Sequence, residues 1–480
     1  MTKTPDDEIH TTDRHLAQPP PTPTRDARAR PTGLRPLLLR LHFYAGVFVG
    51  PFILLAAVTG LLYALIPQID SMVYRHELTV ERAGEHRLPL ADQIGAARAA
   101  HPEGTVTSIR PPAAPDETTQ VNLSVGDVPP DYGRTVFVDP YTGGVRGALT
   151  TYGQWMPVRA WFDELHRTLH LGTIGRNYSE LAASWLWIIS LAGLVLWYLR
   201  RRDTGKLRRL ALPDRNSRDR RRTVTWHGAV GIWILVALLG LSVTGVTWSR
   251  HGGQSVSLVR QHLDMTAPSV DTTLAAQTSS VETGQHQQHG DMVMPEAGSG
   301  GGALSGADTV WRTAEDAGLR GPMWLYPPTG PDQGWQVAEN KRDWPTRHDA
   351  ISVDPNSGAI TARVNFADWP FLAKLTDWAI DAHMGVLFGL VNQIVLALTA
   401  IGLITIVVRG YVMWWQRRPT RGSAWAMGRP PLRGALRKLS PGVLILLAVG
   451  TIAVGWFLPL FGLSLLAFLV ADVVVAAVKR

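Results

Sequence analysis

Five histidines lie at or near the ends of long apolar segments in this chain. They are His42, His227, His383 and the pair His166 and His170. An ionisable side chain in an apolar helix is costly, so each one is a candidate functional residue. Neutral imidazole is also a good ligand for iron and other transition metals. The pattern therefore predicts metal ligation at the two ends of a helix bundle.

Two of these histidines belong to a repeated sequence. Residues 41–60 read LHFYAGVFVGPFILLAAVTG, and residues 226–245 read WHGAVGIWILVALLGLSVTG. In each copy a histidine precedes a Thr-Gly dipeptide, and the interval from histidine to glycine is 18 residues. Such a match predicts that the chain is an internal duplication.

The segments between the apolar runs repeat as well. Residues 135–147 read TVFVDPYTGGVRG and residues 350–363 read AISVDPNSGAITAR, each typical of a strand, an Asp-Pro turn and a second strand. Amphipathic helices are expected upstream, at 90–102 and 303–318. Each copy therefore predicts a small α+β module.

Long apolar runs identify a membrane protein. They lie at 37–66, 181–199, 230–248, 384–408 and 443–475, and each of the first four can cross a hydrocarbon core of about 30 Å. The fifth run contains Pro459. We interpret it as two short spans joined by a tight turn, which gives six spans; one long kinked helix is the alternative.

The distribution of charge predicts the orientation. Residues 200–222 hold 11 Lys/Arg and 3 acidic residues, and residues 409–438 hold 8 and none. The segments 67–175 and 250–382 are acidic, with 13 and 16 acids against 9 basic residues each. Basic loops stay inside, so the N-terminus is expected in the cytoplasm, with the first run as an uncleaved anchor. The net charge of +8 is thus a topology signal, and nucleic acid is not an expected partner; the lipid bilayer is.

This topology sorts the histidines into two pairs. His42 and His227 are expected near the cytoplasmic face, and His166 or His170 with His383 near the outer face. The chain has no cysteine, which excludes thiolate ligands and covalent haem attachment. Two bis-histidine b haems, one at each face, fit this arrangement. His166 and His170 are four residues apart on one helical face, and the sequence leaves open which of them is the ligand.

The expected fold is a mostly α membrane protein, with four core spans plus a C-terminal hairpin and two α+β extracytoplasmic domains. A second, weaker metal-binding expectation is copper at His286, His289, Met292 and Met294, in an insert at 283–306 that otherwise has the composition of a flexible linker. The predicted divisions are a disordered tail (1–35), span 1 (36–66), outer domain 1 (67–160), an outer helix with span 2 (161–199), a basic loop (200–224), span 3 (225–249), outer domain 2 (250–375), span 4 (376–416), a basic loop (417–440) and the hairpin (441–478).

The motifs LHFYAG…TG, ELHRTLHLGTIGR, WHGAVG…TG and HMGVLFG, with the two VDP-x-x-G modules, resemble the PepSY-associated transmembrane family. These proteins are often described as iron-regulated membrane proteins. The resemblance covers about 36–418 and implies extracytoplasmic PepSY domains and a helix bundle in a bacterial plasma (inner) membrane. It also implies, for some members, haem-containing reductases that release iron from ferric siderophores. Carried over by motif, His42, His166, His227 and His383 would be the haem ligands.

The expected function is a haem-containing membrane oxidoreductase of the ferric-siderophore reductase type. The chain has no GxGxxG motif after a strand and no flavodoxin-like domain, so a separate donor is expected, either quinol or a cytosolic flavoprotein. Two alternatives remain: a non-catalytic PepSY protein for peptidase regulation or protein binding, and a metal transporter. A transporter would use the His/Met insert and the intramembrane histidines, but this reading lacks the intramembrane carboxylates expected of a transporter.

Overall fold

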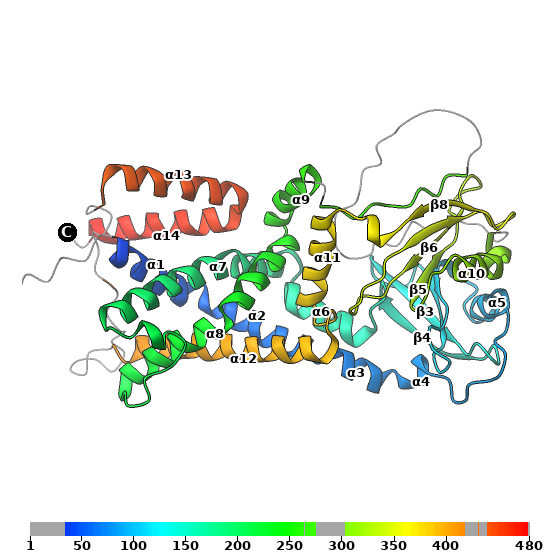
Figure 1. The fold of residues 1–480 in the computed structure, drawn as a ribbon, viewed down its shortest axis with the longest axis horizontal. Helices are drawn as coiled ribbons and strands as arrows, with labels where there is room; N and C mark the ends of the chain where they lie inside the picture. Colours follow the sequence, from blue (N-terminus) through cyan, green and yellow to red (C-terminus); the bar gives the residue numbers. More distant parts are fainter. Residues whose placement is uncertain (1–33, 264, 275–302, 418–430, 432–438, 479–480) are drawn as a thin grey trace, which may run out of the picture.

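The computed structural model describes residues 34–263, 265–274, 303–417, 431 and 439–478. A helix bundle occupies one end of an elongated molecule, and a β-sheet with covering helices occupies the other (Figure 1). The predicted tail, most of the insert and most of the second basic loop lie outside the described residues, and so do His286, His289, Met292 and Met294.

Three helices are long and apolar enough to cross a membrane: α7 (Gly172–Asp203), α8 (Asp219–Thr247) and α12 (Gly389–Trp415). A fourth candidate span is the pair α1 (Leu34–Phe48) and α2 (Gly50–Tyr63), which bend by 58° at their junction. The chain is thus a membrane protein with three or four candidate spans among its described residues.

The bend between α1 and α2 has a local cause. Pro51 has no backbone N–H, and its ring would clash with the carbonyl of Val47 one turn earlier. That carbonyl instead accepts a hydrogen bond from the Tyr411 hydroxyl at 2.8 Å. In the second copy Val236 takes the place of Pro51, and α8 continues without a break. Span 1, predicted as one helix, is therefore a broken one.

Spans 2 and 4 are each preceded by a separate short helix. Helix α6 (Pro157–Thr168) leads into α7, and α11 (Phe371–His383) leads into α12. Left-handed residues interrupt the chain at both junctions, with φ of 55° at His170, 54° at Gly172 and 76° at Gly385. Span 4, predicted at 376–416, is confirmed as a candidate span only from Gly389, because these turns end α11 and restart the chain as α12.

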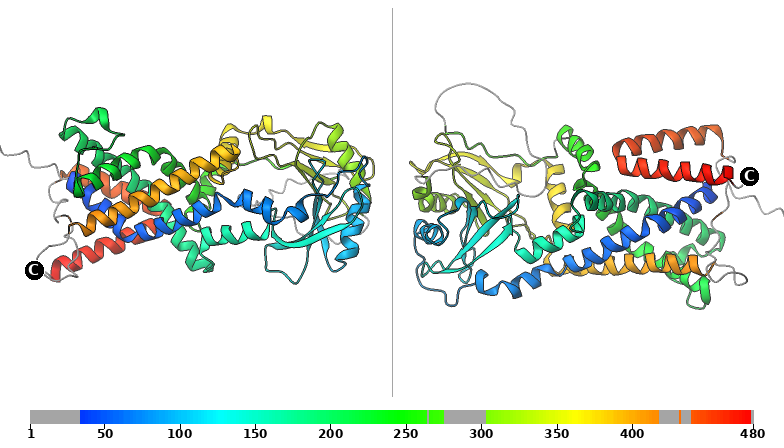
Figure 2. Two further views of the ribbon diagram at one scale, coloured as in Figure 1. Left: turned by 90° about the horizontal axis from the view of Figure 1, so that it is seen from below. Right: turned by 180° about the vertical axis from the view of Figure 1, so that it is seen from behind.

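The fifth apolar run forms two helices, α13 (Pro441–Phe457) and α14 (Pro459–Val478), that turn at Pro459. They lie side by side at the edge of the bundle (Figures 1 and 2), and Gly455 and Gly462 allow their backbones to approach. Helix α14 packs on the bundle through a hydrogen bond from Trp185 to Ser464 at 2.9 Å. Both are shorter apolar helices, so a fifth and a sixth span remain a prediction.

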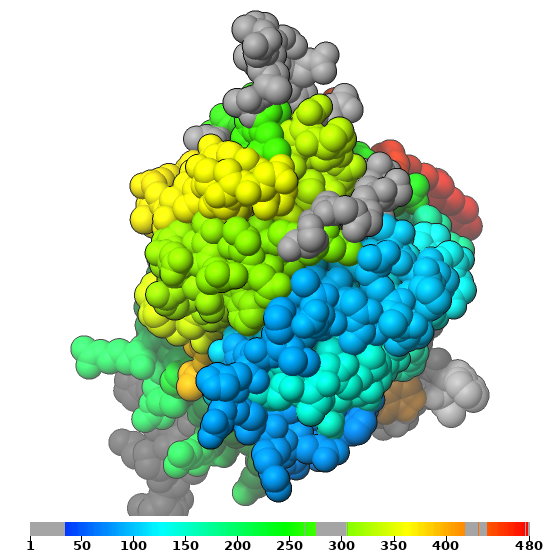
Figure 3. Space-filling view, turned by 90° about the vertical axis from the view of Figure 1, so that its right-hand side faces the viewer, coloured from blue at the N-terminus to red at the C-terminus, as the bar shows by residue number. Residues whose placement is uncertain are grey.

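The two outer modules form one continuous antiparallel sheet. Its order is β4-β3-β2-β1-β5-β6-β7-β8, and the modules join where Ile109 of β1 lies opposite Leu325 of β5. The strands are β1 (Thr105–Arg110), β2 (Thr119–Ser124), β3 (Tyr132–Val138), β4 (Val145–Tyr152), β5 (Met323–Tyr326), β6 (Trp335–Glu339), β7 (Ala350–Val353) and β8 (Ile360–Val364). Figure 3 shows the two modules side by side. The sequence predicted the modules but not their edge-to-edge union.

Two helices, α5 (Leu90–Ala100) and α10 (Ala307–Asp316), cover one face of this sheet and share its hydrophobic core. Asp308 of α10 accepts hydrogen bonds from the Leu90 and Ala91 amides at 2.6 and 3.0 Å, so one module caps a helix of the other. Short elements complete the fold: α3 (Ile66–Val73), α4 (Arg75–Leu78), α9 (Gly252–His262) and the 3-10 turns Leu207–Arg209, Ala303–Gly306 and Phe366–Asp368.

Candidate functional site: two histidine pairs

His42 of α1 and His227 of α8 face each other inside the bundle. Their ring centres are 6.1 Å apart and the ring planes are nearly perpendicular, at 87°. Two metal–imidazole bonds of about 2 Å each, in line, would place the ring centres roughly 6 Å apart. The separation is therefore that of two imidazoles on opposite sides of one metal ion.

The protonation of both inner rings is fixed by backbone carbonyls. Nδ1 of His42 lies 3.0 Å from the carbonyl oxygen of Ile189, and Nδ1 of His227 lies 2.9 Å from that of Ile406. A carbonyl only accepts, so each Nδ1 must carry the proton and donate it. Each neutral ring therefore keeps the lone pair on Nε2, the atom available for a metal.

A glycine follows each of these carbonyls by one helical turn. A Cβ on Gly193 would lie 3.0 Å from Cε1 of His42, and one on Gly410 would lie 3.9 Å from Cε1 of His227. The first of these is closer than ordinary packing allows. At least at Gly193, the absence of a side chain makes room for the imidazole.

The outer pair is His166 of α6 and His383 of α11, and threonines orient both rings. Nδ1 of His166 lies 2.8 Å from the Thr59 hydroxyl, and Nδ1 of His383 lies 2.5 Å from the Thr244 hydroxyl. These are the threonines of the repeated Thr-Gly dipeptide. The sequence singled out that dipeptide without assigning it a role, and histidine spacing alone could not have done so.

The threonines also decide which nitrogen carries the proton. Thr59 donates its hydroxyl hydrogen to the Leu55 carbonyl at 3.0 Å, and Thr244 donates to that of Gly240 at 2.9 Å. A hydroxyl has one hydrogen, so each threonine accepts from the histidine, which leaves Nε2 bare as in the inner pair. Burial lowers the pKa of His166 to about 4 and that of His383 to about 3, which keeps both rings neutral.

A cavity lies between the outer histidines. Its volume is about 200 Å³, and both His166 and His383 line it. Much of the remaining wall consists of small residues. Arg167 and Arg176 also line it, and Arg167 is paired there with Asp163, 3.1 Å from Nε to Oδ2. Trp248 stands with its ring edge-on to His383, 5.2 Å between centres. The cavity is therefore mostly apolar, with cations and one carboxylate in its wall.

The structure separates His166 from His170. Helix α6 ends at Thr168, and His170 lies in the left-handed turn beyond it, exposed and packed against Trp161 at 4.9 Å between ring centres. The two residues therefore do not share a helical face, contrary to expectation. Only His166 lines the cavity with His383.

Two carboxylates lie on apolar helices of the bundle. Asp472 of α14 forms an ion pair with Arg40 of α1, and buried Glu180 of α7 accepts hydrogen bonds from the His251 and Gly252 amides at 2.9 Å. Each carboxylate has a partner that fixes two helices together. Both are accounted for by structural roles.

Comparison with known proteins agrees with this architecture. The sequence profile of the family described as PepSY-associated TM region matches residues 39–417. No curated protein matches the chain at a significant level. The match includes both histidine pairs, both outer modules and the four candidate span segments. The chain therefore belongs to the PepSY-associated transmembrane region family.

Proposed function

We propose that this protein carries electrons across a bacterial inner membrane and reduces an extracytoplasmic acceptor of the ferric siderophore class. His42 with His227 would hold one b haem, and His166 with His383 a second. The observation that carries the proposal is that all four imidazoles make a hydrogen bond at Nδ1, which leaves Nε2 available as a ligand atom. The same tautomer at all four positions supports a shared role as metal ligands.

The residues fit such a group at both sites. The 6.1 Å separation of the inner rings agrees with bis-imidazole ligation. The outer cavity has small side chains in its wall, and Arg167 and Arg176 of its lining could pair with acidic groups of a bound macrocycle. A bound haem would supply reversible one-electron transfer, with a potential set by its axial ligands and their hydrogen bonds.

The protein's own residues orient the ligands and tune them. A hydrogen bond from Nδ1 to a carbonyl or hydroxyl raises the basicity of Nε2 and locks the ring plane. His227 and Thr244 are seventeen residues apart on the continuous helix α8, roughly 25 Å along its axis at 1.5 Å per residue. The two pairs thus lie at different depths of the bundle, as transfer across a membrane requires.

The proposed direction is from inside to outside. The basic loop at 200–222 lies at the end of the molecule far from the sheet, and positive loops favour the cytoplasm. Electrons would then enter near His42 and His227 from quinol or a cytosolic flavoprotein. The acceptor would be reduced where the His166–His383 cavity opens beneath the outer modules.

The proposal is tested with protein in liposomes that enclose dithionite, with a ferric siderophore outside. We expect haem absorption bands in the reduced-minus-oxidised spectrum and siderophore reduction that stops in the variant His42→Ala. That variant and His383→Ala should each remove about half of the spectral signal, since each removes one of two sites. His262→Ala is the matched control, because His262 is exposed on α9 and outside both pairs.

Two outcomes contradict the proposal. One is an absence of haem bands in protein made with haem supplied. The other is siderophore reduction that proceeds equally in His42→Ala, which would show that electrons do not pass through the inner pair. Haem bands without reduction of several siderophore chemotypes would reject the acceptor class while leaving transmembrane electron transfer in place.

A further inference from the structure

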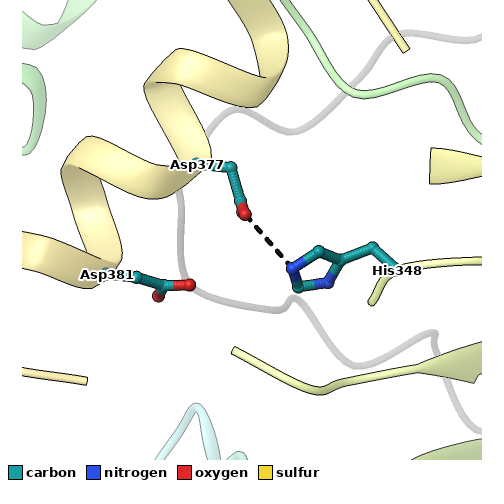
Figure 4. A group of neighbouring side chains, drawn as sticks. All are labelled: His348, Asp377 and Asp381. Carbon is teal, nitrogen blue, oxygen red and sulfur yellow. Dashed lines mark ion pairs between the residues drawn. The ribbon is translucent and has the colours of Figure 1, made fainter. Parts of the chain in front are cut away.

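A second group of possible metal ligands lies outside both histidine pairs. His348 precedes β7, and Asp377 and Asp381 lie one turn apart on α11 (Figure 4). One ligand atom from each residue lies within 4.8 Å of the other two. Donors on one divalent ion at about 2.1 Å lie at most about 4.2 Å apart, so small side-chain movements would close the group.

The three ligand atoms lack the hydrogen bonds that buried polar atoms normally make. Nε2 of His348 and Oδ2 of Asp377 are 3.2 Å apart, yet neither atom meets hydrogen-bond geometry. Oδ2 of Asp381 is also buried without a partner, and the Asp381 side chain is only 1% exposed. Each unsatisfied atom costs about 1–3 kcal/mol, and one cation would satisfy all three together.

Neighbouring side chains hold the group in place. Nε of Arg342 donates to Oδ1 of Asp381 at 2.7 Å, which leaves Oδ2 directed towards His348 and Asp377. The His348 ring stacks on Trp369 with 5.8 Å between ring centres. Outer contacts of this kind are typical of metal ligands, because they fix the direction of the donor atoms.

The duplication shows that the fold does not need this group. When the Asp-Pro turns are aligned, His348 corresponds to Gly133; when His166 is aligned with His383, Asp377 corresponds to Ala160. The first module therefore builds the same sheet and the same helix without two of the three ligands. The group is a feature that only the second copy carries.

We propose that His348, Asp377 and Asp381 form a binding site for a divalent first-row transition metal ion such as Fe²⁺, Co²⁺ or Zn²⁺. One imidazole and two carboxylates favour such ions over Mg²⁺, which prefers oxygen ligands alone. The site borders the outer cavity: Arg342 also lies 3.1 Å from the sulfur of Met384, which lines that cavity. The proposal does not depend on haem.

The test is calorimetric titration of the detergent-purified full chain with Co²⁺, and separately with Zn²⁺. Every protein in the test carries His286→Ala and His289→Ala, so that these two histidines of the insert cannot bind the added metal. We call this parent protein the background. We expect one saturable site, with affinity lowered at least about tenfold by Asp377→Asn and by His348→Gln. The control is Asp316→Asn, because Asp316 is an exposed acid of the same module.

Thermal unfolding gives a second readout that separates lost binding from lost folding. Bound metal should raise the melting temperature of the background protein and of Asp316→Asn, but not of Asp377→Asn, whose metal-free melting temperature should match the background. Equal affinity in all variants would overturn the proposal. So would no saturable uptake at about 1 mM metal, the result expected if His348 and Asp377 form only an ion pair.

Discussion

The hydroxyl of Thr244 tests whether a hydrogen bond at Nδ1 of His383 keeps Nε2 of that ring available as a metal ligand. Thr244→Val keeps the shape of the side chain but removes the oxygen that accepts from Nδ1 of His383. The buried N–H would lose its partner at a cost of about 1–3 kcal/mol, and the ring could turn to place its proton on Nε2. At about 1.4 kcal/mol per tenfold, outer-site haem affinity should fall roughly 10–100-fold.

The assay is haem transfer from the purified protein to an excess of an apo-globin, followed by absorption. Thr244→Val should release one of two haems faster, and Thr244→Ser, which keeps the hydroxyl, should behave as wild type. Thr405→Val is the matched control, because Thr405 makes the same bond to a carbonyl one turn back, at 2.8 Å, but touches no histidine. If haem release is unchanged in Thr244→Val, or is equally fast in Thr405→Val, the hydrogen bond between Thr244 and His383 does not hold the outer haem.

Three further predictions follow from the packing and the charges. Gly193→Val should displace the His42 ring and remove about half of the haem signal, whereas Gly240→Val should not, because nothing lies within 4 Å of a Cβ there. Burial raises the pKa of Asp70 to about 6, so the folded protein holds this proton more tightly than the unfolded chain does. The free energy of unfolding should therefore fall as pH rises from about 4 through 6. Thermal unfolding of Asp70→Asn should show a weaker dependence on pH in this range. Asp308→Ala should cost about 1–2 kcal/mol of unfolding free energy by uncapping α5, measured by denaturation against the exposed control Asp316→Ala.

Several features of the fold followed from the sequence because they rest on local patterns. Apolar length identified the spanning segments, and the repeated Asp-Pro turns identified β3–β4 and β7–β8. The helix predicted at 90–102 is α5, and the one predicted at 303–318 contains α10. Each of these depends on residues close together in the chain.

Other features depended on contacts that no local pattern contains. The union of the modules at Ile109 and Leu325 joins strands more than two hundred residues apart. The choice between His166 and His170 depended on where α6 ends, and the left-handed turn that ends it begins at Leu169, a residue type that rarely adopts it. The group around His348 depended on a loop folding back onto α11.

The roles of Thr59 and Thr244 lie between these two cases. The Thr-Gly repeat was visible in the sequence, but its partners sit on α6 and α11, which are other helices. The bend at Pro51 could likewise have been predicted, because proline has no amide hydrogen. The hydrogen bond that Tyr411 donates to the Val47 carbonyl could not have been predicted. The repeat therefore identified Thr59 and Thr244, and the structure shows that their partners are His166 and His383.

Haem content per chain, measured by the pyridine haemochrome method, tests whether each histidine pair holds one haem, as we propose. The protein is purified from cells supplied with haem. We expect two non-covalently bound b haems per chain in the wild type and one in each of His227→Ala and His166→Ala, with His170→Ala unchanged. A wild-type protein without haem, or a full loss in His170→Ala alone, would contradict this proposal.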